Sequence, residues 1–321
     1  MARKESNAPK IAVPSTRQIV LRRTFDAPRT LVWKAWTKPE QLMRWWGPQG
    51  FTSPVCKVDL RVGGSYLFCM RSPDGQDYWS TGVYREIVEP ERIVCTDNFA
   101  DEKGNAVPAS YYGMAGDWAP ELLVTITLEE VQGQTRLTLE HVGLPEGEHS
   151  RMAADGWNGS FDKMAAALER TTRFMTRGNR EIVMTRVFDA PRELLFRAYT
   201  DPKLIPQWWG PARYTTTVDR MDVRPGGSWR YVHRGADGSE YAFRGEYREI
   251  VPPERLVSTF EFEGLPGHVS VDTASFEDLG GKTRLTAVSL FDSVEDRDGM
   301  ASSGAEQGAI ETWERLARLL A

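Results

Sequence analysis

The stretch Trp45-Trp46-Gly47-Pro48 occurs twice in this chain, the second time as Trp208-Trp209-Gly210-Pro211. The copies lie 163 residues apart (208 − 45), and roughly half of the positions between 19 and 94 match their partners at this spacing without a gap. Self-similarity at a fixed period indicates repeated structural units, and this period has the length of a whole domain. The sequence therefore predicts one fold written twice.

The predicted domains divide the 321 residues almost equally. Residues 17–175 are expected to form the first domain and residues 176–321 the second, with residues 1–16 as a flexible N-terminal tail. Later in each copy the spacing between matched residues is shorter than 163. Thr135 and its partner Thr283, for example, are 148 residues apart (283 − 135). The first domain is therefore 15 residues longer (163 − 148), and the extra residues fall in an aromatic-rich loop at 100–120.

The order of hydrophobic patterns in each half predicts an α+β fold. A period-two strand comes first, two short helices follow, then a run of strands, and a long helix closes the unit. The closing helices are expected at 150–174 and 299–320, with a short polar linker at 173–179. The pairs Gly63-Gly64 and Gly226-Gly227 are typical of a turn or bulge between strands. The predicted architecture is a curved antiparallel sheet whose concave face is covered by the closing helix.

Composition and charge narrow the classes of function. The net charge is −5 and the pI about 5.6, which disfavours nucleic acid and anionic membranes as partners. No apolar run approaches the roughly 20 residues of a membrane span, and the N-terminus lacks the apolar core of a secretory signal. Cys56, Cys69 and Cys95 match no metal or redox spacing, so we expect structural thiols in a reducing, cytoplasmic compartment. No cofactor and no metal are expected.

Several motifs, each present in both halves, together resemble the AHSA1-like family, named for the C-terminal domain of the activator of the Hsp90 ATPase. In the first half they are Phe25-Asp26-Ala27-Pro28-Arg29, Ala35-Trp36-Thr37-Lys38-Pro39-Glu40, the Trp-Trp-Gly-Pro turn, Gly63-Gly64-Ser65-Tyr66 and Tyr84-Arg85-Glu86-Ile87-Val88-Glu89-Pro90-Glu91-Arg92. The family belongs to the START/Bet v 1-like (SRPBCC) helix-grip superfamily. The resemblance implies two tandem helix-grip domains, each usually with a cavity between sheet and closing helix.

The resemblance does not imply one activity, because a fold does not determine function. Residues 1–16 are too few to form the separate N-terminal domain through which the eukaryotic activator contacts Hsp90. An Hsp90-type chaperone is therefore not the expected partner.

The candidates for a ligand pocket are aromatic residues that alternate inward on the strands and differ between the halves. Core packing is the alternative role for each of them, since an aromatic stripe under a helix usually belongs to the core. Trp45 and Trp46 could line the mouth of a cavity, but because the motif recurs, a structural role that anchors the short helices on the sheet is favoured for all four tryptophans: Trp45, Trp46, Trp208 and Trp209. The pocket candidates are Tyr66, Phe68, Tyr78, Trp118 and Trp157 in the first half and Trp229, Tyr231, Tyr241 and Phe243 in the second.

Three functions follow as hypotheses. The favoured one is binding of hydrophobic or aromatic small molecules without defined catalysis. The second is a cyclase- or hydrolase-like enzyme with His141 or His233 as the base, although Ser289 and Met70 stand at their positions in the other half. No Ser/His/Asp set, metalloprotease motif or phosphate loop supports an enzyme. The third is a chaperone-linked interaction through the loop at 100–120.

Overall fold

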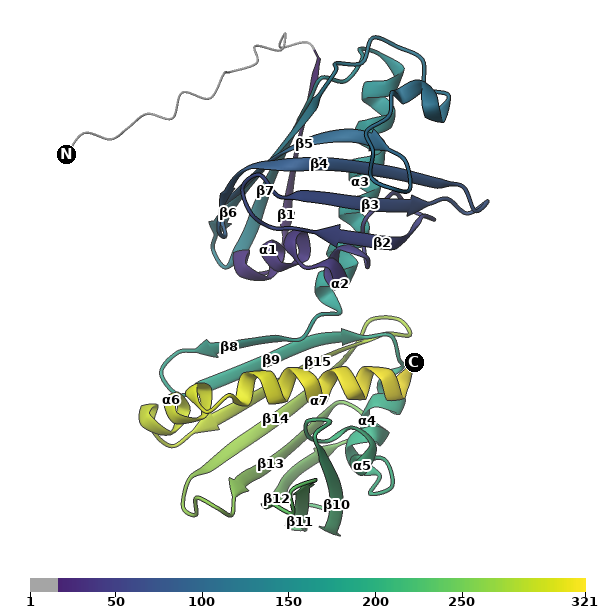
Figure 1. Cartoon of the computed structure of the whole chain (residues 1–321). Helices are drawn as coiled ribbons and strands as arrows, with labels where there is room; N and C mark the ends of the chain where they lie inside the picture. The colour runs from purple at the N-terminus through teal and green to yellow at the C-terminus, as the bar shows by residue number, and fades with distance from the viewer. Residues whose placement is uncertain (1–16) are drawn as a thin grey trace, which may run out of the picture. The chain divides into compact units, whose positions relative to one another are not determined.

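The computed structural model describes residues 17–321, and the expected tail at 1–16 lies outside this range. The chain divides into two units, the first ending at Leu168 and the second beginning at Glu169. Each unit has one antiparallel sheet and its own helices, which confirms the predicted α+β class (Figure 1).

The first unit is a seven-stranded sheet that grips one long helix. The strands hydrogen-bond in the order β1-β7-β6-β5-β4-β3-β2. The elements are β1 (Gln18–Phe25), α1 (Arg29–Thr37), α2 (Pro39–Leu42), β2 (Thr52–Val58), β3 (Ser65–Arg71), β4 (Asp77–Val88), β5 (Arg92–Ala100), the 3₁₀ helix η1 (Ala109–Tyr112), β6 (Leu122–Val131), β7 (Gln134–Val142) and α3 (Glu148–Glu169).

The core of the first unit lies between the sheet and α3. Phe25 at the end of β1 meets Phe161 of α3 edge-on, with the ring centroids 6.1 Å apart. Met164 and Leu168 continue the same helical stripe at intervals of three and four residues, and both are buried. Each such side chain contributes about 1.5–3 kcal/mol by leaving water. This stripe fixes which face of α3 covers the sheet.

The second unit repeats this plan with one more strand. Its eight strands hydrogen-bond in the order β10-β11-β12-β13-β14-β15-β9-β8. The elements are β8 (Arg173–Arg177), β9 (Glu181–Phe188), α4 (Arg192–Thr200), α5 (Ile205–Trp208), β10 (Tyr214–Met221), β11 (Ser228–Gly235), β12 (Glu240–Val251), β13 (Arg255–Phe262), β14 (Val269–Asp278), β15 (Thr283–Phe291), α6 (Val294–Ser302) and α7 (Ala305–Leu320).

The expected polar linker at 173–179 is wrong in its first part. α3 ends at Glu169 instead of reaching residue 174, and β8 begins at Arg173. β8 pairs with β9 along its full length, with Phe174 opposite Met184. Thr171 and Thr172 lie between the end of α3 and the start of β8. Because β-branched residues favour extended backbone over helix, they explain why the helix ends here.

The closing helix of the second unit, expected to run unbroken over 299–320, is divided into α6 and α7. Gly304 lies between them with a φ of +82°, a left-handed conformation that glycine adopts without strain. The ring of Trp313 packs edge-on against Phe188, just as Phe161 packs against Phe25 in the first unit. Trp313 and Phe161 therefore occupy matched positions in the closing helices, 152 residues apart (313 − 161). The strands before them differ by 148, so the second unit carries four extra residues (152 − 148) at this break.

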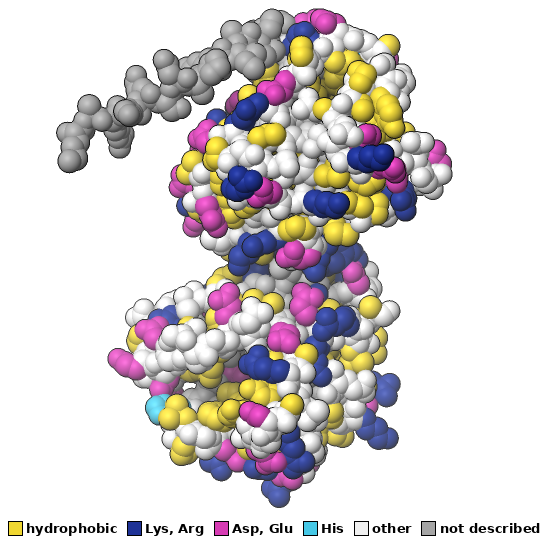
Figure 2. Space-filling view, in the orientation of Figure 1, with side chains coloured by type: hydrophobic (Ala, Val, Ile, Leu, Met, Phe, Trp, Pro, Cys, Tyr) yellow, Lys and Arg dark blue, Asp and Glu magenta, His cyan; other side chains and the backbone are white. Residues whose placement is uncertain are grey.

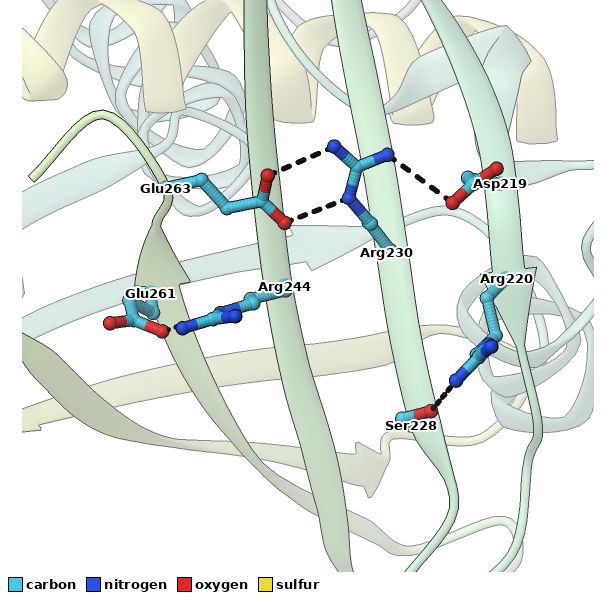
Figure 3. Close-up of polar contacts among 7 residues, drawn as sticks. All are labelled: Asp219, Arg220, Ser228, Arg230, Arg244, Glu261 and Glu263. Atoms are coloured by element: carbon cyan, nitrogen blue, oxygen red, sulfur yellow. Dashed lines mark hydrogen bonds and ion pairs between the residues drawn. The ribbon is translucent and has the colours of Figure 1, made fainter. Parts of the chain in front are cut away.

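The outer face of the second sheet carries Arg220, Arg230 and Arg244 in register on three neighbouring strands. Like charges in register destabilise a sheet, but here an equal number of acidic side chains offsets them (Figure 3). Arg230 forms a two-pronged pair with Glu263, at 2.8 and 2.9 Å. Asp219 contacts Arg230 at 3.2 Å, and Glu261 contacts Arg244 at 2.6 Å. The charges therefore balance within this row.

Candidate functional site

The repeated tryptophan turn anchors the short helices in both units. Trp45 is fully buried, and its indole Nε1–H donates to the carbonyl oxygen of Ala35 at 2.9 Å. Trp208 makes the same contact with Ala198 at 3.0 Å. These contacts support the structural role expected of both tryptophans.

A cation from the closing helix holds the same turn in place. Lys163 Nζ donates to four carbonyl oxygens, the shortest contacts being 2.8 Å to Phe51 and 3.0 Å to Gly47. In the second unit, Arg315 donates to the carbonyl oxygen of Gly210 at 2.6 Å. Burial lowers the pKa of Lys163, and the four acceptors replace the water that the ammonium group loses.

Replacing Lys163 with methionine is expected to lower the free energy of unfolding of the first unit by about 2–3 kcal/mol, because charge-assisted hydrogen bonds to the turn are lost while the apolar stem is kept. Urea denaturation followed by tryptophan fluorescence measures the change. The exposed Lys34 on α1 provides the matched control, Lys34→Met. Equal stability losses in the two variants would contradict the assigned role of Lys163.

The interior of the first unit contains a small cavity of about 30 Å³. Three of the predicted ligand residues line it, Tyr66, Phe68 and Trp157, together with Trp46 and Asp97. A cavity of this size holds one or two water molecules, whereas ligand pockets measure about 300–1,000 Å³. Aromatic side chains therefore close most of the space between sheet and helix.

A chain of buried and half-buried polar side chains adjoins one wall of this cavity. Tyr66 Oη donates to Asp97 Oδ1 at 2.8 Å, and His141 Nε2 lies 3.5 Å from Asp97 Oδ2. On its other side, His141 Nδ1 accepts from the indole Nε1–H of Trp157 at 3.3 Å. Because Nδ1 accepts, the proton of the neutral imidazole lies on Nε2 and faces the carboxylate. Asp97 is thus the centre of the network.

Burial controls the protonation of this network. Burial lowers the pKa of His141, and the Asp97 carboxylate opposes this effect without reversing it. Burial, assisted by Asp97, raises the pKa of Tyr66 well above its ordinary value. At neutral pH the network therefore contains a neutral imidazole and a protonated phenol, which both face the carboxyl group of Asp97.

Two predicted ligand residues of the first half lie away from this cavity. Tyr78 packs against Tyr112 of η1, with ring centroids 5.4 Å apart, and Trp118 packs against Phe99 at 5.2 Å. The hydroxyl of Tyr112 also donates to the carbonyl oxygen of Ala100 at 2.7 Å. These aromatic residues tie the longer loop of the first unit to its sheet.

In the second unit, three of the four predicted ligand residues pack around Trp209. The ring centroid of Trp209 lies 5.1 Å from that of Tyr231, 5.2 Å from Phe243 and 6.4 Å from Trp229. Tyr241 is 38% exposed and belongs to the rim of the sheet. The interior of this unit is therefore aromatic as well, and Tyr241 joins the cluster through Phe262 and Tyr214.

His233 is enclosed by aromatic side chains. Its ring lies 4.7 Å from that of Trp209, and a Cβ atom added at Gly210 would meet Nε2 at 2.2 Å. Nε2 has no hydrogen-bond partner within residues 17–321. Burial, with a smaller effect from Arg315 and a second arginine, lowers the pKa of His233 to about 4. In the first unit Met70 fills this place against Gly47, so the position takes an uncharged side chain in both units at neutral pH.

A row of inward-facing positions differs between the units. In the first unit Cys95, Val124 and His141 lie in register on β5, β6 and β7. The same row in the second unit is Ser258, Asp272 and Ser289 on β13, β14 and β15. The two interiors therefore offer different polar groups at equivalent places.

Sequence reasoning missed the two interior carboxyl groups, Asp97 and Asp272. Asp97 lies on the same face of β5 as the buried Ile93. Asp272 lies on the same face of β14 as the buried Ala274 and Phe276. Because successive side chains of a strand point to opposite faces, this alternation is the signal that places both carboxyl groups inside.

Neither a reactive thiol nor a metal site occurs among the described residues. Burial is the main cause that raises the pKa of Cys69 to about 11 and of Cys56 to about 12, so both thiols are protonated at neutral pH. Within residues 17–321, no group of three or more His, Cys, Asp or Glu side chains is placed to hold a metal ion. Over the same residues, no helix is both long and apolar enough to cross a membrane.

These features define a class of protein, one with two tandem helix-grip units, each a curved antiparallel sheet closed by helices. The family model described as "Activator of Hsp90 ATPase homolog 1-like protein" matches residues 26–169 and 189–321. The chain belongs to this family, with one match in each half, which confirms the resemblance found in the sequence.

Similar solved structures each cover about half of the chain. A protein from Arthrobacter aurescens is 26% identical with a TM-score of 0.44, over 46% of this chain and 90% of its own. A protein from Chromobacterium violaceum is 30% identical with a TM-score of 0.41, over 48% and 97%. An Hsp90 activator from Plasmodium falciparum is 22% identical with a TM-score of 0.35, over 47% and 96%. A search of curated proteins found no match.

Proposed function

We propose that the first unit binds a small aromatic molecule that carries a hydroxyl or carbonyl group. The observation that carries this proposal is the polar network of Tyr66, Asp97 and His141 at the cavity wall. His141 Nε2 and the indole Nε1 of the cavity residue Trp46 have no hydrogen-bond partner within residues 17–321. Buried donors without a partner cost free energy, and a polar atom of a ligand would supply one.

The fold itself does not require this network. At the position of Asp97 the second unit has Phe260 (260 − 163), and at the position of His141 it has Ser289 (289 − 148). The second unit nevertheless folds into the same sheet and closing helices. A half-buried carboxyl group is costly where an apolar residue suffices, which supports a role beyond folding for Asp97 in the first unit.

Entry of a ligand requires side chains to move, because the cavity of about 30 Å³ is smaller than an aromatic ring. Trp46 and Trp157 are half-buried, and their rings meet edge-on with centroids 5.4 Å apart. One comes from the turn after α2 and the other from α3. A shift of these two rings would join the cavity to solvent without disturbing the sheet.

Binding is favoured over catalysis by the state of His141. Its Nδ1 faces the indole N–H of Trp157, and its Nε2 carries a proton toward Asp97. Neither nitrogen is available to take a proton from a substrate, which a general base must do. The enzyme hypothesis therefore lacks its central group in the first unit.

The test is a titration of the full chain with 2-naphthol, and with naphthalene as the matched probe that lacks the hydroxyl. We expect saturable quenching of tryptophan fluorescence by 2-naphthol, and at a hundred times the dissociation constant a stabilisation of about 2.7 kcal/mol. Naphthalene should bind the wild type about tenfold more weakly than 2-naphthol does. The variant Asp97→Asn should bind 2-naphthol about tenfold more weakly than the wild type. Each difference corresponds to one lost hydrogen bond.

Glu129→Gln is the control for loss of a carboxylate, because Glu129 is exposed on β6 and pairs with Arg136. It should leave the affinity for 2-naphthol unchanged. Equal affinity of wild type and Asp97→Asn, or no saturable binding of either probe, would refute the proposal. In the second case the chaperone-linked interaction becomes the leading hypothesis, and affinity capture with the full chain would follow.

A further inference from the structure

We infer that the second unit holds a separate binding site at Asp272, which takes a protonated amine carried on an aromatic or apolar body. Asp272 faces the interior, because it alternates along β14 with the buried residues Ala274 and Phe276. The site uses none of the residues of the first unit. It extends the proposed function to a second ligand class, and substitution of Asp272 separates its test from binding in the first unit.

The carboxyl group of Asp272 has neutral hydrogen-bond partners only. Ser270 Oγ donates to Oδ1 at 2.8 Å, and the side chain of Ser289 also hydrogen-bonds to the carboxyl group. Within residues 17–321, no Lys, Arg or His side chain pairs with Asp272. Burial raises the pKa of this carboxyl group, because the charged form loses its hydration, and a cation beside it would offset that loss. An interior carboxylate without a cation is a place for a cationic ligand.

The second unit lacks the counterpart of Trp157. The offset of 152 residues between the closing helices places Ala309 at this position (157 + 152). In the first unit the Trp157 ring lies 5.9 Å from Trp36 and 5.4 Å from Trp46 and hydrogen-bonds to His141. An alanine is too small to fill the volume that this indole occupies, and we infer that the ligand takes its place above the inward row of the sheet.

The surroundings of this volume are more exposed than in the first unit. The three residues that correspond to the neighbours of Trp157 are all half-buried: Tyr199, Trp209 and Ser289. Helix α6, which precedes the break, has no buried residue and so covers the sheet only loosely. Figure 2 shows a hollow in this unit, bordered in part by hydrophobic side chains, beneath the junction of α6 and α7 in Figure 1.

Aromatic rings stand beside the carboxyl group. Phe260 lies opposite Ser270 in the sheet, one inward position from Asp272 and its partner Ser258. Phe243 packs against Phe260 at 5.7 Å and against Phe262 at 5.3 Å, and all three rings are half-buried. A carboxylate next to aromatic faces favours an organic cation, because charge and ring quadrupole both attract it. The rings would in turn cover the apolar body of the ligand.

The test compares two probes of the same shape, 1-naphthylmethylamine as its cation and neutral 1-naphthylmethanol, by calorimetric titration of the full chain at pH 7. We expect the amine to bind at least tenfold more tightly than the alcohol. Asp272→Asn should remove this preference and weaken amine binding at least tenfold. Glu277→Gln, on the outer face of the same strand and paired with Arg284, should change neither affinity.

A second variant, Ala309→Trp, restores the indole of the first unit and leaves Asp272 in place. It should abolish the amine binding that depends on Asp272, with circular dichroism confirming that the chain remains folded, whereas binding of the alcohol in the first unit should persist. Equal affinity for amine and alcohol, or amine binding that survives both substitutions, would overturn the inference. Failure of 2-naphthol to bind while the amine binds through Asp272 would refute the first-unit proposal alone.

Discussion

Replacing Trp45 with alanine is expected to lower the free energy of unfolding of the first unit by about 3–5 kcal/mol, the largest effect of any single change considered for this unit. The substitution removes a fully buried indole and leaves the carbonyl oxygen of Ala35 without its donor. The void adjoins Trp36, whose ring lies 4.8 Å from that of Trp45. In thermal terms the loss corresponds to a fall of roughly 10 °C.

Trp208→Ala is the matched variant, because Trp208 makes the same hydrogen bond to Ala198 in the second unit. Hydrogen exchange read by peptide mass spectrometry reports each unit separately. We expect faster exchange in residues 17–168 for the first variant and in 169–321 for the second. If either substitution left its own unit as protected as in the wild type, the anchoring role of this turn would be wrong.

Acidification is expected to destabilise the second unit through His233. The pKa of this buried imidazole is lowered to about 4 in the folded chain, from an ordinary value of about 6.5. Between about pH 4 and 6.5 the imidazole of His233 binds a proton more readily in the unfolded chain than in the folded chain. The contribution of the neutral imidazole to the free energy of unfolding is therefore fully present above about pH 6.5 and is lost as the pH falls toward 4. The shift corresponds to about 3 kcal/mol lost at pH 4.

His233→Met tests this prediction, because Met70 already fills the equivalent place in the first unit. The variant should have a stability close to that of the wild type at pH 7 and exceed it by about 3 kcal/mol at pH 4. Urea denaturation at both pH values measures the difference, and other titrating groups cancel because they are shared. Parallel pH profiles of the two proteins would show that His233 does not titrate in this way.

The fold was predictable because its markers are local and occur twice. Turn glycines, helix-starting prolines and strand alternation each act over a few residues, and the repeat made them visible above chance. The break between α6 and α7 was not predictable in this way. It depends on four extra residues between β15 and α7, and no motif repeats there to reveal a change of spacing.

The candidate sites were harder to predict than the fold. The aromatic side chains of the strands and closing helix predicted pocket residues, and three of these, Tyr66, Phe68 and Trp157, line the cavity. Asp97 and Asp272 were not predicted, because an aspartate in a strand usually faces solvent, and only the burial of its alternating neighbours indicates otherwise. The closure of the first interior depends on how the aromatic rings interlock, which no pattern of residue types expresses.

The pairing of β8 with β9 has a consequence for how the two halves can be separated. Without β8, the backbone N–H and C=O groups of β9 would form an open sheet edge, and such edges promote aggregation. A second half produced from residue 176 onward would lack most of β8 and is at risk of associating edge to edge. Any truncation, fusion or recombination that keeps this half soluble should therefore begin before Arg173, so that β8 is included with the second unit.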